Sequence, residues 1–166
     1  MNQIIKHYHQ AVEMVTAENT LLEVTEIEQE GQFLKAYMHT PPCLRDLWLV
    51  AQGHGENEYL VYGEERWTYA EAGEVVANFS GWLHSEGIGS GDRVAIAMRN
   101  YPEWIFAHWA VISVGAVVVG LNAWWVADEM AYALEDSRPK LLIADDRRLA
   151  TFSEIALRFP DITVVS

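Results

Sequence analysis

Apolar and polar residues follow two different periods along this chain. Four short runs are almost entirely apolar, with Thr163 as the one polar residue, which is typical of strands buried on both faces of a parallel sheet. These runs are 94–98, 116–119, 141–144 and 162–165. Between them, apolar residues recur every three or four positions, which predicts amphipathic helices through 104–112, 128–134 and 146–159. Strands that alternate with helices predict an α/β fold: a layered parallel sheet with helices on its faces.

Capping residues indicate where several helices begin. Thr68 and Glu71 have the spacing of a capping box, and Gly87 suits the left-handed position after the helix that follows. Asn100 is expected to cap the next helix, with Pro102 in its first turn. The first of these helices therefore ends just before Gly87, and the second begins after Asn100.

Acidic residues precede the last two helices. Asp128 is expected to open one of them, which ends before Pro139. Either Asp145 or Asp146 is expected to cap the other, which runs through Phe159. A proline closes each segment because it lacks a backbone N–H and clashes with the preceding turn.

Two smaller elements precede the alternating region. Residues 44–51 carry an apolar stripe that predicts a short amphipathic helix. Residues 59–62 and 66–69 are aromatic and β-prone, and a glycine-containing turn lies between them. This arrangement predicts a β-hairpin directly before the alternating strands and helices.

Residues 1–42 form an acidic N-terminal extension with six glutamates and two lysines. Ile4, Tyr8 and Val12 fall on one helical face, so a helix is expected near the start. Residues 21–27 either continue as a helix or begin a strand, and their pattern does not choose between the two.

The composition restricts the partners of the chain. It has 166 residues, of which 51% are hydrophobic, which is enough for a sizeable core. A formal net charge of −13 disfavours nucleic acid and anionic membrane surfaces as partners. A single cysteine excludes an internal disulfide, and the longest apolar run, 109–121, is too short to span a bilayer. We expect a cytoplasmic protein without integral membrane contact.

Few residues carry a pattern typical of catalysis. The glycines of 87–92 follow a helix and precede a strand, the reverse of a phosphate-binding loop, so a turn is expected. His108 lies on an apolar helix face and is expected to be a hydrogen-bonded core residue. We assign no catalytic, cofactor-binding or metal-ligating residue. Trp124 and Trp125, in the loop after the second strand, are the candidates for an apolar pocket or a contact surface.

Five segments resemble motifs of adenylate-forming enzymes in their order and spacing. They are Trp67–Glu71 (WTYAE), Gly87–Ile96 (GIGSGDRVAI), Asn100–Trp104 (NYPEW), Gly115–Asn122 (GAVVVGLN) and Leu134–Lys140 (LEDSRPK). Over residues 44–165 the chain is therefore similar to the AMP-forming acyl-CoA synthetases. The resemblance implies that residues 43–166 are a partial AMP-binding domain, the N-terminal subdomain of such an enzyme.

The resemblance also implies a two-step reaction for the parent enzyme. In this family a carboxylate attacks the α-phosphorus of MgATP to give an acyl-adenylate and pyrophosphate, and the thiol of CoA then displaces AMP. The parent would thus use ATP, Mg²⁺ and CoA, with a fatty or other apolar acid as substrate. The family's phosphate loop, acidic metal site and mobile lysine lie downstream of this stretch. We therefore expect the 166 residues to be an inactive fragment whose partner is the remainder of the enzyme.

Departures from the family pattern leave the subfamily, and hence the identity of the acyl substrate, undetermined. Gly120 and Ala123 stand where the family often has proline, and the pair Trp124–Trp125 is bulkier than usual. The alternative is a stand-alone, non-catalytic α/β interaction module derived from the same family. In either case we expect self-association, because the last strand edge and apolar helix faces would be uncovered.

Overall fold

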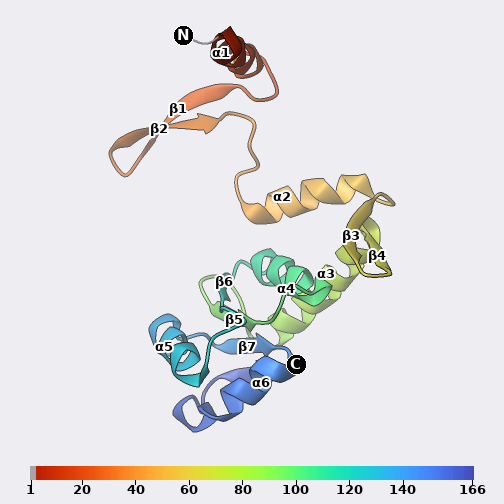
Figure 1. The fold of residues 1–166 in the computed structure, drawn as a ribbon, viewed down its shortest axis with the longest axis vertical. Coiled ribbons are helices and arrows are strands. Elements are labelled where there is room, and N and C mark those ends of the chain that lie inside the picture. Colours follow the sequence, from red (N-terminus) through yellow and green to blue (C-terminus); the bar gives the residue numbers. More distant parts are fainter. Residues whose placement is uncertain (1–2) are drawn as a thin grey trace. The chain divides into compact units, whose positions relative to one another are not determined.

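A computed structural model describes residues 3–166 of the chain (Figure 1). The chain divides into two compact units, Met1–Pro42 and Cys43–Ser166. The first unit contains one helix and one hairpin, and the second contains a hairpin, a four-stranded sheet and the remaining helices.

The first unit resolves the choice that the sequence left open. Helix α1 (Gln3–Val15) is followed by strands β1 (Val24–Gln29) and β2 (Gln32–Tyr37), which pair antiparallel. The segment after α1 is therefore a strand and not a continued helix. Glu30 and Gly31 form the turn, both with positive φ (52° and 79°), a conformation that glycine adopts without steric cost.

The second unit opens with the predicted helix and hairpin. Helix α2 (Leu44–Ala51) leads into a short 3₁₀ turn, η1 (Gln52–His54). Strands β3 (Glu58–Tyr62) and β4 (Glu65–Thr68) then form the expected antiparallel hairpin. Aromatic side chains hold this region together, since the Trp48 and Trp109 rings stack 5.0 Å apart and Trp109 Nε1 donates to Tyr59 Oη at 2.8 Å.

The capping box before helix α3 (Tyr69–Ser85) is confirmed. The Glu71 backbone N–H donates to Thr68 Oγ1 at 3.1 Å, and the Thr68 N–H donates to a Glu71 carboxylate oxygen at 2.8 Å. Two N–H groups at the helix start are thereby satisfied. Gly87 follows the helix with φ +75°, as expected.

The four apolar runs form one parallel sheet, as the sequence predicts. Its strands are β5 (Arg93–Ala97), β6 (Val117–Gly120), β7 (Leu141–Ala144) and β8 (Thr163–Val165). Their order is β6-β5-β7-β8, and all three neighbouring pairs are parallel. β5 lies inside the sheet and is buried along four of its five residues.

Helices cover both faces of the sheet (Figure 1). Val94 and Ile96 face a cluster that includes residues of α3 and of α4 (Pro102–Ser113). Ala95 and Ala97 face the opposite cluster, which includes residues of α5 (Ala127–Ser137) and α6 (Asp146–Ser153). Because successive strand residues point to opposite faces, one apolar run supplies both cores.

Two predicted helix boundaries are wrong. Asn100 does not cap α4: the cap position is Tyr101, which provides no side-chain hydrogen bond, and Pro102 takes the first helical position. The helix predicted through Phe159 ends at Ser153, and a 3₁₀ turn, η2 (Ala156–Arg158), follows it. There the chain tightens into i to i+3 hydrogen bonds, such as Arg158 N–H to the Ile155 carbonyl at 2.9 Å.

The other two boundary expectations differ less from the structure. α5 begins at Ala127, one residue before Asp128, and the Glu129 carboxylate accepts from the Val126 N–H at 3.0 Å. Of the two aspartates before α6, Asp145 is the cap, and its carboxylate accepts from the Arg148 N–H at 3.0 Å.

Candidate functional site at the carboxyl edge of the sheet

The loops that follow β5, β6 and β7 meet at one edge of the sheet. In open parallel sheets, ligands bind outside the carboxyl ends of the strands, so this edge is the natural place for a site. A backbone hydrogen bond joins two of the loops here: the Asp145 N–H donates to the Ala97 carbonyl at 3.2 Å. The Asp145 carboxylate in turn accepts from the Arg99 N–H at 3.1 Å.

A buried arginine fastens the third loop to this edge. Arg148 is only 4% exposed, although it carries a charge. Its Nη1 lies 3.2 Å from the Asp145 carboxylate, and its Nε donates to the Ala123 carbonyl at 2.7 Å. Arg148 Nη2 donates to the same carbonyl. A buried charge that is paired and fully hydrogen-bonded is tolerated, and this one fixes the loop after β6.

Asp145 is held in its charged form by this network. Burial by itself would raise the pKa of Asp145, but hydrogen bonds from the backbone N–H groups of Arg148 and Arg99 oppose it, as does the Arg148 guanidinium. The net result is a pKa below the ordinary value of the carboxyl group. The carboxylate therefore serves as a fixed anchor between two loops and has no free proton to exchange at neutral pH.

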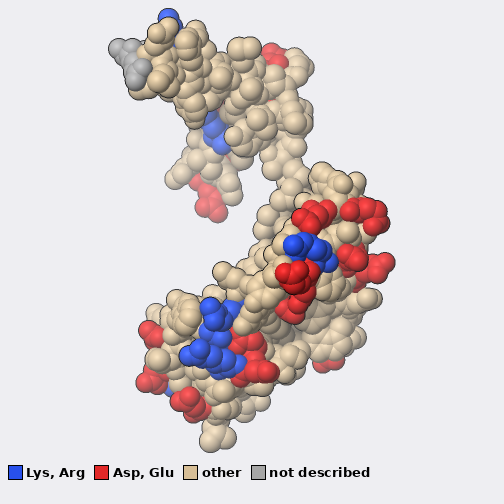
Figure 2. Space-filling model, turned by 45° about the vertical axis from the view of Figure 1, so that its right-hand side comes forward, with Lys and Arg blue, Asp and Glu red and all other residues tan. Residues whose placement is uncertain are grey.

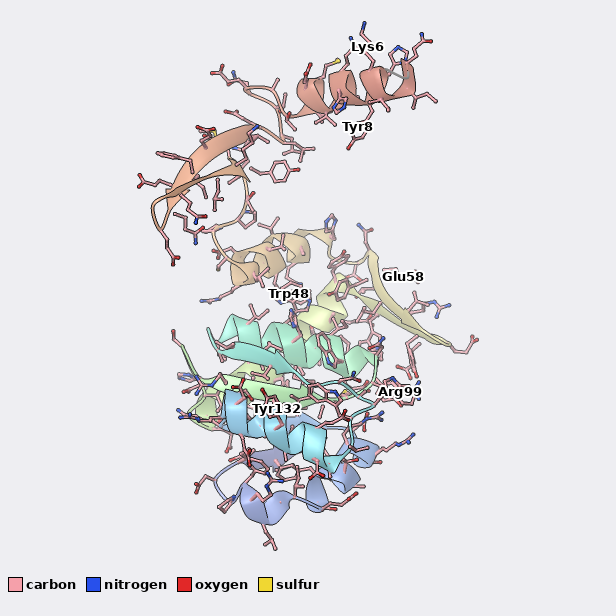
Figure 3. The ribbon with its side chains drawn as sticks, turned by 60° about the vertical axis from the view of Figure 1, so that its left-hand side comes forward. Lys6, Tyr8, Trp48, Glu58, Arg99 and Tyr132 are labelled. Carbon is pink, nitrogen blue, oxygen red and sulfur yellow. The ribbon has the colours of Figure 1, made fainter. Side chains whose placement is uncertain are left out.

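Trp124 stands over this network as an exposed aromatic platform. Its side chain is 66% exposed, and the Arg99 guanidinium lies 4.8 Å from the ring centroid. The Arg148 guanidinium lies 6.0 Å from the same ring. Two cations near one aromatic ring give cation–π contacts that help to hold the ring in place. Arg99 lies at the outer rim of this edge in the view of Figure 3.

The two neighbouring tryptophans have different surroundings. Trp124 points into solvent beside Arg99, while Trp125 is half-buried and packs against the cluster around Leu121 and Met130. The Trp124 backbone N–H donates to the Asn122 side-chain oxygen at 2.9 Å, and this bond fixes the turn from Asn122 to Trp124. Trp124 therefore belongs to the surface of the site, and Trp125 mainly to the packed core beneath it.

Several hollows lie along this edge, among them one of about 360 Å³ beside Met98, Ala144 and Asp145. Two others share aromatic residues. One, of about 300 Å³, is lined by Tyr62, Arg99, Asn100, Tyr101, Ala123 and Trp124. The other, of about 270 Å³, lies beside it and has an apolar lining that includes Leu60, Val61, Trp104 and Ile105. Tyr62 and Tyr101, whose rings meet edge to face at 5.8 Å, line both. The edge thus offers an aromatic, cationic hollow next to an apolar one.

The remaining residues with candidate chemistry are structural. The Gly87–Asp92 segment is the predicted turn, in which the Asp92 carboxylate accepts from the Gly89 N–H at 3.0 Å and pairs with Lys140 at 2.7 Å. The hydrogen bond from Lys140, followed by that from Gly89, lowers the pKa of Asp92.

His108 lies between two tryptophans, and the expected hydrogen bond is missing on one side. Its ring stacks on Trp104 at 5.2 Å and meets Trp109 edge-on at 5.3 Å. Nδ1 is buried without a partner among the described residues, and burial lowers the pKa of His108. The neutral ring therefore acts as an aromatic packing residue.

Two features typical of metal and phosphate sites are missing from the residues that the structure describes. Within residues 3–166, no three His, Cys, Asp or Glu side chains are grouped as metal ligands would be. The loops after β5, β6 and β7 contain no glycine that would let a phosphate approach the backbone.

No helix in this range could cross a membrane. On the face shown in Figure 2, acidic side chains lie beside the basic ones.

The sequence alone did not single out Arg99 or Arg148. Arg99 directly follows the predicted strand 94–98, and this position at a carboxyl end was a usable signal. Arg148 lies three residues after the capping Asp145, a spacing that brings the two side chains together on one turn. Its contact with Ala123 could not be read from the sequence, because the two residues are far apart in the chain.

Known proteins resemble residues 47–164 of the chain in sequence, and solved structures resemble it in fold. Residues 47–164 match the family described as AMP-binding enzyme. A crotonobetaine/carnitine–CoA ligase of Salmonella paratyphi A is 30% identical over 118 residues, which cover 68% of this chain and 23% of the relative. A 3-hydroxybenzoate/4-hydroxybenzoate–CoA ligase of Thauera aromatica is 33% identical over 107 residues, covering 64% of this chain and 20% of the relative.

Solved structures agree with these relatives at the level of the fold. The anthranilate–CoA ligase AuaEII, bound to anthranoyl-AMP, superimposes with a TM-score of 0.69 at 20% identity, over 74% of this chain and 25% of that one. The N-terminal subdomain of Klebsiella oxytoca NpsA superimposes with a TM-score of 0.65 at 22% identity, over 75% and 31%. The chain thus spans about a fifth to a quarter of the curated relatives' length. Because the matched family covers well over half of its residues, the chain belongs to the AMP-binding enzymes.

Proposed function

We propose that this chain forms the N-terminal part of an ATP-dependent acid–CoA ligase, including its first parallel sheet and the helices that cover it. In that enzyme a carboxylate would react with ATP to give an acyl-adenylate and pyrophosphate, and CoA would then take the acyl group and release AMP. The observation that carries the proposal is the family match over residues 47–164, which includes every strand of the parallel sheet except the last residue of β8. The curated relatives that share this stretch are named as CoA ligases.

In this proposal the carboxyl edge forms one wall of the substrate site. The hollow beside Arg99 and Trp124 is cationic and aromatic, and its neighbour is apolar. Such a wall suits an anionic group next to an apolar one, which is the character of an apolar carboxylic acid and its activated forms. We propose a fatty or other apolar acid, and aromatic acids belong to this class.

The wall by itself lacks groups that would perform the chemistry. Asp145 is occupied in pairing Arg148, and neither the loop after β5 nor the loop after β6 can cradle a triphosphate. The proposal therefore places ATP, Mg²⁺ and most of CoA against residues outside these 166. The role of this chain is to position substrate and to support the partner layers of the enzyme.

Isotope exchange between ATP and pyrophosphate tests the proposal. The 166-residue protein, assayed alone with fatty and aromatic acids, is expected to show no exchange. A chimaera of the Thauera aromatica ligase, with residues 47–164 in place of its matching segment, is expected to retain exchange with hydroxybenzoate. The same chimaera carrying Arg148→Met, which releases the loop after β6, should lose most of that activity.

Two outcomes would contradict the proposal. Exchange catalysed by the 166 residues alone would show that the chemistry resides within them. A chimaera that is folded, as judged by circular dichroism and a cooperative melt, but inactive would show that this sheet cannot serve a ligase. The nucleotide sequence beyond codon 166 gives an independent check, because a continuing reading frame with a Gly/Thr-rich, lysine-ending loop is expected.

A further inference from the structure

The hollow beside Trp124 has one charged residue in its lining, and that residue is Arg99. The other lining residues are three aromatic side chains, an amide and an alanine: Tyr62, Tyr101, Trp124, Asn100 and Ala123. None of these described lining residues is a carboxylate, although the chain as a whole has a formal net charge of −13. The charge of this hollow is therefore opposite in sign to the charge of the protein.

The Arg99 guanidinium has no carboxylate that neutralises it. None of the ion pairs within residues 3–166 includes Arg99, and its guanidinium lies against the Trp124 ring. The Asp145 carboxylate belongs to the same edge, but it is paired with Arg148 at 3.2 Å. Because these two charges balance each other, Arg99 leaves an uncompensated positive charge at the edge.

The backbone and the side chain of Arg99 have separate roles. The backbone N–H donates to the Asp145 carboxylate at 3.1 Å and so fixes the loop after β5. The side chain donates no hydrogen bond to any residue that the structure describes, and a guanidinium carries five N–H donors. These donors are available to a ligand while the backbone of Arg99 stays in place.

The aromatic rings of the hollow would suit a cation if Arg99 were absent. Several aromatic side chains around one space are the usual way to bind a quaternary ammonium group. Here the Arg99 guanidinium already lies 4.8 Å from the centroid of the Trp124 ring. A second cation in this hollow would lie close to Arg99 and be repelled by it. The hollow therefore favours an anion.

The neighbouring hollows restrict the rest of the ligand. Tyr62 and Tyr101 also line the hollow of about 360 Å³, whose charged lining residues are all acidic: Glu65, Glu103, Asp145 and Asp146. An anion is repelled on that side. The same two tyrosines line the apolar hollow of about 270 Å³. The group attached to the anion therefore finds an apolar surface on one side only.

We propose that Arg99 selects the charge of the ligand at this edge. Its guanidinium binds a carboxylate or phosphate that is attached to a planar or apolar group, and it excludes ligands with a fixed positive charge. In the proposed ligase, on which this assignment of the ligand rests, the anion belongs either to the acid or to a nucleotide. Acids that carry a quaternary ammonium group are accordingly poor substrates.

Nuclear magnetic resonance titration of the full 166-residue chain tests this selectivity, with the indole N–H signal of Trp124 as the reporter. The probes form two pairs of an anion and its neutral analogue: benzoate with benzamide, and AMP with adenosine. In at least one pair, the anion should bind fivefold or more tightly than the neutral analogue, and that pair identifies the source of the anion. Phenyltrimethylammonium should leave the Trp124 signal of the wild type unchanged.

Substitutions of Arg99 separate its charge from its place in the loop. Arg99→Gln keeps the backbone N–H to Asp145, and it should weaken anion binding roughly tenfold or more. The same variant should bind phenyltrimethylammonium, because the rings are then free of a cation. Arg99→Lys keeps the charge and should retain part of the preference for the anion.

Arg147→Gln is the matched control. Arg147 is an exposed arginine that lines a different hollow beside Trp124, so its loss removes the same charge from the same edge. Anion binding by this variant should stay within twofold of the wild type.

Three results would overturn the proposal. One is a wild type that binds neither anion more tightly than its neutral analogue. The second is an Arg99→Gln variant that keeps the preference for the anion, or binds phenyltrimethylammonium no better than the wild type. The third is an Arg147→Gln variant that loses as much as Arg99→Gln, since the general charge of the edge would then attract the anion.

The binding measurement and the exchange assay fail independently. A chimaera that is active in exchange, together with a 166-residue chain that shows no charge selectivity, would reject the role of Arg99 and leave the ligase function intact. An inactive chimaera, together with a charge-selective chain, would reject the ligase function and leave the anion site.

Discussion

The Arg148 side chain donates a hydrogen bond to the backbone carbonyl of Ala123, at 2.7 Å and 25 residues earlier in the chain. This bond ties helix α6 to the loop after β6 and so places Trp124 at the carboxyl edge of the sheet. The same guanidinium pairs with Asp145, which is hydrogen-bonded to the loop after β5. One buried charge thus organises three loops, and the consequences can be measured.

Arg148→Met should lower the free energy of unfolding by about 3 kcal/mol, because it leaves the Asp145 carboxylate and the Ala123 carbonyl without their partner in a largely buried place. Urea denaturation gives the value. Arg148→Lys, which keeps the charge but not the planar fork, should recover only part of the loss. In the Asp145→Asn background, Arg148→Met should cost clearly less, and equal costs in both backgrounds would show that the pair is not coupled.

The Asp145 anchor predicts a specific acid sensitivity. Its pKa is lower in the folded protein than the ordinary value of 3.8, so the folded state binds this proton less readily than the unfolded state. The stability that Asp145 contributes is therefore fully present above about pH 4 and is lost as pH falls through the folded pKa. Unfolding free energies measured from pH 6 to about pH 3 should fall less steeply for Asp145→Asn than for the wild type. Identical slopes would contradict the assignment.

The neighbouring tryptophans should respond differently to truncation. Trp124→Ala removes an exposed ring and should change the unfolding free energy by less than about 0.5 kcal/mol. Trp125→Ala removes a half-buried ring from the cluster with Leu121 and Met130, and should cost about 2 kcal/mol. Thermal melts of the two variants give the comparison. If Trp124→Ala were the more damaging change, Trp124 would be a packing residue and not part of the site surface.

The capping box offers a local test of the fold. Thr68→Ala removes the side-chain oxygen that accepts the Glu71 N–H, and should destabilise the second unit by about 1 kcal/mol. Thr68→Ser keeps this oxygen and serves as the matched control, with a loss well below that of the alanine variant. Chemical denaturation followed by tryptophan fluorescence reports both. Equal losses for Ala and Ser would mean that the methyl group, and not the cap, is what matters.

Local patterns in the sequence determined most of the elements of the second unit. Runs such as Leu141–Ala144 are short and apolar at every position, which is typical of a strand covered on both faces. The Thr68–Glu71 box marks a helix start within four residues, so it needs no tertiary contact to be recognised. The parallel sheet follows from these elements because strands joined through helices pair side by side in one direction.

The tertiary structure decided what depends on residues far apart in the chain. Arg148 meets Ala123, and Arg99 meets Trp124, only because parallel strands bring their carboxyl ends to one edge. The two adjacent tryptophans look equivalent in sequence, and the packing of the loop alone separates them. In the first unit, the strand β1 became definite only through its pairing with β2, because residues 21–27 suit a helix and a strand equally well. Short-range periodicity determines whether a segment is a helix or a strand. The site depends on contacts between residues that are far apart in the sequence, and no local sequence pattern reveals such contacts.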